Sequence, residues 1–171
     1  MISQMLENNI IRHSSSAFSA PIVIVPKKNG DIRMCIDYRK LNQATKRPIF
    51  HIPSAHKIFN KLGGNSYFTT LDLSKGYYQI CMDEKDVHKT AFSTSQGHFE
   101  FIRMPFGRNG APATFQRALT SIISSFVGKS CCVYLDDIIV YGRDEKENDK
   151  RLDARSVVFF RLEAVKREMC F

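Results

Sequence analysis

Two adjacent aspartates, Asp136 and Asp137, interrupt an otherwise apolar stretch and restrict how that stretch can fold. Three apolar or aromatic residues precede the pair and three apolar residues follow it, which predicts a strand, a turn and a second strand over residues 131–142. Two carboxylates beside a core repel each other, and desolvating either one is costly without a cation. The pair therefore indicates either a metal site at the edge of a sheet or an ordinary Asp-Asp turn in water.

A third carboxylate lies in another predicted strand, YFTTLDL, at residues 67–73. The two-residue period of a strand places Phe68, Thr70 and Asp72 on one face. If this strand lies beside the Asp136–Asp137 hairpin, the carboxylates converge and form the all-oxygen ligand set that Mg²⁺ prefers. Two such ions clamp the attacking and leaving oxygens in phosphoryl transfer. A two-metal polymerase site is one hypothesis, although the spacing alone leaves the convergence open.

Basic side chains surround a predicted hairpin at residues 20–37, whose turn is Lys-Asn-Gly-Asp. Lys27, Lys28 and Arg33 flank that turn, where they can grip a triphosphate through charge-assisted hydrogen bonds or form an ordinary solvated turn. The net charge of +8, from 25 Lys and Arg against 17 Asp and Glu, favours a polyanionic partner but is a weak indication alone.

The remaining pattern predicts a single α+β domain with an antiparallel sheet. Helices are expected over residues 1–11, over residues 53–62, from Pro112 to near Gly128, and from Asp144 onward. The five cysteines contain no Cys-x-x-Cys pair, which disfavours a zinc ribbon or a disulfide scaffold. Neither a membrane-spanning apolar run nor a signal peptide is recognised. We therefore expect an intracellular protein with no membrane partner, located in a cytoplasmic particle or in the nucleus.

Five motifs occur in a characteristic order: LDLSKGYYQI, HKTAF, GHFEFIRMPFG, APATFQ and YLDDIIV. Together they resemble the reverse transcriptase domain of gypsy-like LTR retrotransposons, which is related to retroviral polymerases. The upstream stretch PKKNGDIRMCIDYRKLN is similar to the fingers segment of that family. The resemblance implies an α+β polymerase palm, with an antiparallel sheet backed by helices, a partial fingers subdomain and no thumb. It divides the domain 1–171 into fingers-like residues up to about 66, palm residues 67–145, and an irregular C-terminal helix over 146–171.

The same resemblance assigns roles to individual residues. Asp72 and Asp136 would bridge two Mg²⁺ ions, with Mn²⁺ as a possible substitute, Asp137 would complete the triad, and the Leu73 carbonyl would reach one metal. Lys28, or alternatively Lys27, and Arg33 would hold the β- and γ-phosphates of the incoming nucleotide. Tyr77 would be the steric gate against a ribose 2′-OH, and the pocket beside it would be lined by Phe106 and Gly107. The template and primer would lie near Gln116 and Tyr134.

The implied activity is RNA-directed DNA polymerisation, with deoxynucleoside triphosphates and a primed RNA or DNA template as partners. The expected absence of the thumb and departures from the family at Arg108 and in the C-terminal part favour an alternative, a degenerate relic that at most binds nucleic acid. Arg108 replaces an apolar residue, Asn148 stands where a histidine is expected, and the segment 151–171 is irregular.

Overall fold

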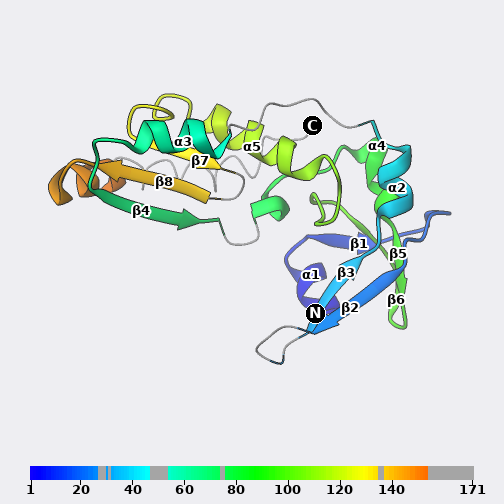
Figure 1. Cartoon of the computed structure of the whole chain (residues 1–171). Coiled ribbons are helices and arrows are strands. Elements are labelled where there is room, and N and C mark those ends of the chain that lie inside the picture. The colour runs from blue at the N-terminus through cyan, green and yellow to red at the C-terminus, as the bar shows by residue number, and fades with distance from the viewer. Residues whose placement is uncertain (27–29, 31, 47–53, 74–75, 135–136, 154–171) are drawn as a thin grey trace. The chain divides into compact units, whose positions relative to one another are not determined.

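The computed structural model of the chain describes residues 1–26, 30, 32–46, 54–73, 76–134 and 137–153 (Figure 1). The described residues fall into two compact units that alternate along the sequence. Unit 1 contains those within Met1–Arg47 and Tyr77–Ala111, and unit 2 contains those within Pro48–Gly76 and Pro112–Glu168. The lysines of the predicted basic turn, Lys27 and Lys28, and the first aspartate of the pair, Asp136, lie outside the described residues.

Unit 1 is organised around a three-stranded antiparallel sheet. Its strands β1 (Ile11–His13), β6 (Gly97–Phe101) and β5 (Phe92–Thr94) lie in the order β1-β6-β5. Helix α1 (Ile2–Glu7) precedes β1 and contributes Ile2 and Met5 to the same core cluster as the buried aromatic rings of the sheet. The helix predicted over residues 1–11 is therefore shorter than expected. Ile11 does not continue the helix but pairs with Phe101 in the sheet, where its side chain is only 2% exposed.

A hairpin of β2 (Ile22–Pro26) and β3 (Ile32–Ile36) completes the predicted N-terminal pattern. Its base packs against the core cluster through Ile22, Met34 and Ile36, whereas Ile24 and Ile32 near the turn are exposed. Helix α2 (Arg39–Ala44) follows directly. The sequence predicts no helix there, since six residues are too few to show a helical period.

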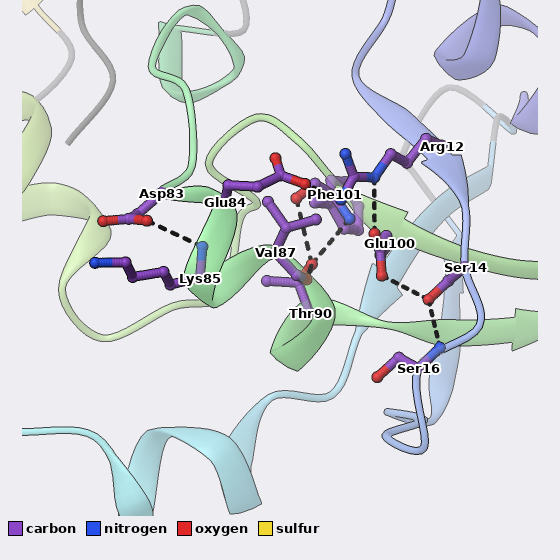
Figure 2. A network of polar contacts seen from close by, with 10 residues as sticks. All are labelled: Arg12, Ser14, Ser16, Asp83, Glu84, Lys85, Val87, Thr90, Glu100 and Phe101. Carbon is purple, nitrogen blue, oxygen red and sulfur yellow. Dashed lines mark hydrogen bonds and ion pairs between the residues drawn. The ribbon is translucent and has the colours of Figure 1, made fainter.

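Residues 76–103 contain short helical turns as well as the expected strands. The 3-10 turns η1 (Gly76–Gln79) and η2 (His88–Thr90) flank helix α4 (Glu84–Val87). Asp83 caps α4 by accepting a hydrogen bond from the Lys85 N–H, as Figure 2 shows. Thr90, which is fully buried, accepts from the Phe101 N–H and donates to the Val87 carbonyl, so this turn is joined to β6.

A buried carboxylate, Glu100, joins β1 to β6 (Figure 2). It lies opposite Arg12 in the ladder, and the Arg12 Nε donates to it at 2.7 Å while the Ser14 hydroxyl donates at 2.6 Å. The same guanidinium also pairs with Glu84. Burial raises the pKa of Glu100, but the hydrogen bonds from Ser14 and Arg12 outweigh it, so the pKa lies below its ordinary value.

We expect Glu100→Gln to lower the free energy of unfolding by about 1.5–3 kcal/mol at pH 7, because hydrogen bonds to a charged acceptor are lost. A carboxyl with a lowered pKa stabilises the fold above its unfolded pKa, and this contribution disappears as the pH falls through the folded pKa. Urea unfolding at pH 7 and pH 3 tests both points, with the exposed Glu145→Gln as control. A difference from wild type that persists unchanged at pH 3 contradicts the electrostatic explanation.

Unit 2 contains a second three-stranded antiparallel sheet, in the order β4-β8-β7. Its strands are β4 (Tyr67–Asp72), β7 (Cys131–Tyr134) and β8 (Asp137–Gly142). The strand at 67–73 lies beside the hairpin at 131–142, an arrangement that the spacing left open, in a register that runs from Tyr67 opposite Gly142 to Asp72 opposite Asp137. One face of the β7–β8 hairpin is fully buried and consists of Cys131, Val133, Ile138 and Val140.

Helices α3 (Ala55–Leu62) and α5 (Ala111–Ile122) lie in unit 2 where helices were predicted. Helix α5 ends before the predicted end near Gly128, because the chain continues in tighter turns in which the Phe126 N–H donates to the Ile123 carbonyl. Ile58 of α3 packs with Cys132 and Tyr141. Residues 145–153 are also helical, and Asn148 ties this helix to the sheet because its Nδ2 donates to the Thr69 hydroxyl at 2.8 Å. Asn148 is 6% exposed, so at this position the residue that departs from the family has a structural role.

The two units differ from the predicted division near residue 67. Helix α3, which the sequence places in the fingers-like part, groups with the β4-β8-β7 sheet, and the hairpin β5–β6 groups with β1. Antiparallel pairing of β1 with β6, which are distant in sequence, produces this interleaving. In the part of the chain that the structure describes, no helix is long and apolar enough to cross a bilayer.

Candidate functional site

Two of the three predicted aspartates lie at one end of the unit 2 sheet. Asp72 is the last residue of β4 and Asp137 the first of β8, and the antiparallel register sets them directly opposite each other. Tyr134, the last residue of β7, pairs with Asp137 from the other side. The three positions thus form one row across the sheet. The sheet brings together two of the three residues of the predicted triad, and the third, Asp136, precedes Asp137 outside the described residues.

The chemistry of this row fits a hard divalent cation. Asp137 is exposed, and adjacent carboxylates at a strand end repel each other unless a cation lies between them. The Leu73 carbonyl accepts a hydrogen bond from the Gly76 N–H at 2.9 Å, which leaves its second lone pair for another partner. Within the described residues alone, no cluster of three His, Cys, Asp or Glu residues is complete. Asp136 is required to complete the predicted ligand set.

Gly76 lies in close contact with helix α5. A Cβ atom on Gly76 would lie 2.4 Å from the Phe115 ring, which is 3% exposed and belongs to α5. A side chain at position 76 would therefore displace this ring. The contact therefore places the Gly76 backbone directly against α5.

The two residues predicted near template and primer have contacts inside unit 2. The Gln116 amide is 1% exposed, and its Nε2 donates to the Val133 carbonyl at 3.1 Å, so that α5 is tied to β7. Tyr134 is half-buried against the cluster of Ile58, Cys132 and Tyr141. Gln116 therefore supports β7 from the interior of unit 2. A contact between Gln116 and a template stays a prediction.

Three aromatic residues of unit 1 form a small cluster around the predicted nucleotide pocket. The ring of Phe106, 46% exposed, lies 4.8 Å from the ring of Tyr77 and 5.2 Å, edge-on, from that of Tyr78. Tyr78 in turn stacks on the buried Phe101 at 6.2 Å. The structure therefore brings together the predicted gate, Tyr77, and the predicted pocket residue, Phe106.

Gly107 follows in a conformation that favours glycine, with φ at +87°. A Cβ at this position would lie 3.5 Å from the Ile36 carbonyl, so the loop runs close to the end of β3. The loop is also bonded to Asn42 of α2, whose Nδ2 donates to the Gly107 carbonyl at 2.8 Å and whose Oδ1 accepts the Asn109 N–H at 3.0 Å. The sequence gives no signal for this asparagine, because its partners are distant along the chain.

Arg33, the predicted phosphate-binding residue of the hairpin, is exposed on β3 opposite Val25. Its predicted companion Lys28 lies in the turn outside the described residues. The position of Arg33 on an exposed hairpin is compatible with both alternatives that the sequence leaves open, a phosphate contact and a solvated basic turn.

Arg108, the residue that departs from the family, turns partly inward. Its Nη1 is buried and has no hydrogen-bond partner among the residues that the structure describes. Its charge acts on Tyr38, whose pKa is raised by burial and lowered to a smaller extent by Arg108. The Tyr38 hydroxyl donates to the Thr90 carbonyl at 2.9 Å, so the guanidinium lies at the edge of a packed and hydrogen-bonded region.

We expect Arg108→Leu to raise the free energy of unfolding by about 1 kcal/mol, because an unbonded buried donor costs about 1–3 kcal/mol. The exposed Arg117→Leu is the matched control and should change stability by less than about 0.5 kcal/mol. Denaturant unfolding of both variants measures the difference. A loss of stability in Arg108→Leu would show instead that the guanidinium is well compensated.

The family model described as "Reverse transcriptase (RNA-dependent DNA polymerase)" matches residues 25–166. The chain is 45% identical over 166 residues to the Retrovirus-related Pol polyprotein from transposon 297 of Drosophila melanogaster, which covers 94% of this chain and 15% of that protein. It is 40% identical to the corresponding polyprotein of transposon gypsy, over 89% of this chain and 15% of that protein. The chain thus spans about one-seventh of these relatives.

Solved structures with a similar fold include the native prototype foamy virus protease-reverse transcriptase, with a TM-score of 0.86 and 25% identity over 94% of this chain and 21% of that one. A foamy viral protease-reverse transcriptase in complex with an RNA/DNA hybrid gives a TM-score of 0.84 at 25% identity, over 93% of this chain and 21% of that one. The predicted fold class, a reverse transcriptase palm with a fingers part, is confirmed by this similarity.

Proposed function

Since this chain belongs to the reverse transcriptase family of RNA-dependent DNA polymerases, we propose that it forms the nucleotidyl-transfer core of a retrotransposon Pol polyprotein. The reaction is attack of a primer 3′-OH on the α-phosphate of a deoxynucleoside triphosphate, with release of pyrophosphate. The observation that carries the proposal is the register that sets Asp72 opposite Asp137 at the strand ends of unit 2.

Asp72, Asp136 and Asp137, with the Leu73 carbonyl, are the residues that would hold two Mg²⁺ ions. When bound, such ions lower the pKa of an attacking hydroxyl and neutralise charge on the triphosphate. The protein supplies position and preorganised charge, since phosphoryl transfer requires little covalent chemistry from side chains. Placing the ligands at the ends of paired strands supports this role, because the sheet fixes their spacing.

The incoming nucleotide would be bound by residues of unit 1. Arg33 and Lys28 would grip its phosphates, and Tyr77 would close the pocket where a ribose 2′-OH projects. The packing of Phe106 on Tyr77 supports a shared role in forming that pocket. Gly107, which follows Phe106, has a positive φ that favours glycine at this position.

We propose a primed RNA or DNA template as the macromolecular partner, held through its phosphates. The net charge of +8 supports such a contact, and a structural relative is described in complex with an RNA/DNA hybrid. Tyr134, which pairs with Asp137, would lie nearest the primer, and Gln116 would act behind it.

A second candidate is a degenerate, non-catalytic element that binds nucleic acid without turnover. The observation that favours it is Arg108, whose buried Nη1 has no hydrogen-bond partner among the described residues and which follows Phe106 and Gly107 in the chain. The intact carboxylates and Tyr77 favour the polymerase.

Primer extension on poly(rA)–oligo(dT) with Mg²⁺ or Mn²⁺ separates the two candidate functions. The variant Asp136→Asn serves as the inactive control for wild type. Extension by wild type alone supports the polymerase. No extension by folded wild type, together with salt-sensitive binding of the template, supports the degenerate element.

A further inference from the structure

We propose that Asn42 is a positioning residue that holds the loop 106–109 and thereby sets the shape of the nucleotide pocket formed by Tyr77 and Phe106. This inference rests on the proposed function and deepens it. It depends on contacts within unit 1 and assigns a role to a residue that has no part in the proposed metal or phosphate contacts.

Both the donor and the acceptor of the Asn42 side-chain amide form hydrogen bonds with one short loop. The amide donates to the Gly107 carbonyl at 2.8 Å and accepts the Asn109 N–H at 3.0 Å. One bond to a carbonyl and one to an N–H, with only Arg108 between the two bonded residues, require a side chain with a donor and an acceptor in one plane. A carboxylate satisfies only the second bond and places negative charge beside the carbonyl, while alanine satisfies neither.

The residues that precede and begin helix α2 have a local ion pair and one long-range hydrogen bond to the core of unit 1. The Asp37 carboxylate accepts the Arg39 N–H at 3.0 Å and its guanidinium at 2.6 Å, and the Arg39 hydrogen bond lowers the pKa of Asp37 to about 2. Tyr38, which is 2% exposed, is bonded to the Thr90 carbonyl. The start of the helix is therefore joined to the core of unit 1.

The loop combines an exposed ring with a glycine, and both features leave freedom that a support can remove. Phe106 is 46% exposed, and Gly107 has the backbone freedom of a residue without Cβ. The hydrogen bond from Asn42 holds the Gly107 carbonyl, directly after Phe106. This bond limits the orientations in which the Phe106 ring can contact the Tyr77 ring, which lies 4.8 Å away. Without Asn42, we expect the ring to sample several positions and the pocket to lose its shape.

Amide hydrogen exchange followed by NMR tests the clamp independently of catalysis. In Asn42→Ala, exchange of the Asn109 N–H should accelerate by roughly three- to tenfold, as expected for loss of one hydrogen bond. In Asn42→Asp, which keeps the acceptor, this N–H should remain protected. Gln43→Ala, an exposed change on the same helix, is the matched control. Unchanged exchange in Asn42→Ala overturns the clamp.

Nucleotide measurements test the role of the clamp in the pocket. Asn42→Ala and Asn42→Asp should weaken binding of Mg²⁺–dTTP by about threefold or more, seen by NMR titration. In primer extension they should raise KM more than they lower kcat and reduce the preference for dTTP over UTP.

The outcomes separate this inference from the proposed function. Normal nucleotide affinity and sugar preference in a folded Asn42→Ala overturn the positioning role and leave the polymerase intact. If wild type binds nucleotide but does not extend a primer, the proposed turnover fails while the affinity comparison still decides the role of Asn42. If wild type binds no nucleotide, both proposals fail.

Discussion

Asp72→Asn is expected to reduce Mg²⁺-dependent nucleotide incorporation by about 10³-fold or more, because a lost metal ligand removes several kcal/mol of charge stabilisation. The substitution keeps the size of the side chain and removes its charge at the position opposite Asp137. Steady-state primer extension measures the loss. Binding of a primed template, measured as a function of salt, should change little, since phosphate contacts come from basic groups elsewhere.

Asp149→Asn is the matched control for this prediction. Asp149 is an exposed aspartate of the same unit, on the helix over residues 145–153. Its substitution should leave incorporation within about twofold of wild type. Equal losses of incorporation and of template binding in a folded Asp72→Asn would contradict the separation of roles between carboxylates and basic surface. Near-normal incorporation would remove Asp72 from the proposed metal site.

Tyr77→Ala is expected to relax discrimination against ribonucleotides by about 10- to 100-fold, because steric exclusion by a pocket wall has effects of this size. The Tyr77 ring packs against Phe106 at 4.8 Å, so truncation opens the space that the two rings share. The ratio of kcat/KM for dTTP and UTP on the same primed template measures the effect.

Tyr77→Phe keeps the ring and is the control that isolates the steric contribution. It should retain the selectivity of wild type if the ring is the gate, and it should lose selectivity if the hydroxyl is essential. Unchanged sugar preference in Tyr77→Ala would assign the gate to another residue. Thermal unfolding of both variants distinguishes a local change in the pocket from general destabilisation of unit 1.

Several elements followed from local patterns in the sequence. The alternation in YFTTLDL predicted β4, the apolar residues on either side of Asp136–Asp137 predicted β7 and β8, and the periodicity after Pro112 predicted α5. These predictions held because each element buries one regular face, and a regular face leaves a period in the sequence. The ordered motifs also identified the family, since they place many residue types at fixed intervals.

Elements and boundaries that depend on distant partners were not predicted. The N-terminal helix ends at Glu7 because Ile11 pairs with Phe101, and α2 is too short to have a visible period. The division into two units follows from pairing β1 with β6, which no local pattern encodes.

For the candidate site, the sequence by itself determined the residue types: the carboxylates at the ends of predicted strands, the basic hairpin and the aromatic residue after β4. Only the tertiary structure decided which of them meet. The antiparallel register set Asp72 opposite Asp137, the packing of unit 1 placed Phe106 against Tyr77, and the buried amide of Gln116 was joined to β7. It also revealed Asn42, whose bonds to Gly107 and Asn109 span more than 60 residues of chain. The chemistry of each side chain is a local property that can be read from the sequence. The register between strands and the long-range hydrogen bonds depend on residues distant in the sequence, so they form only when the whole chain packs.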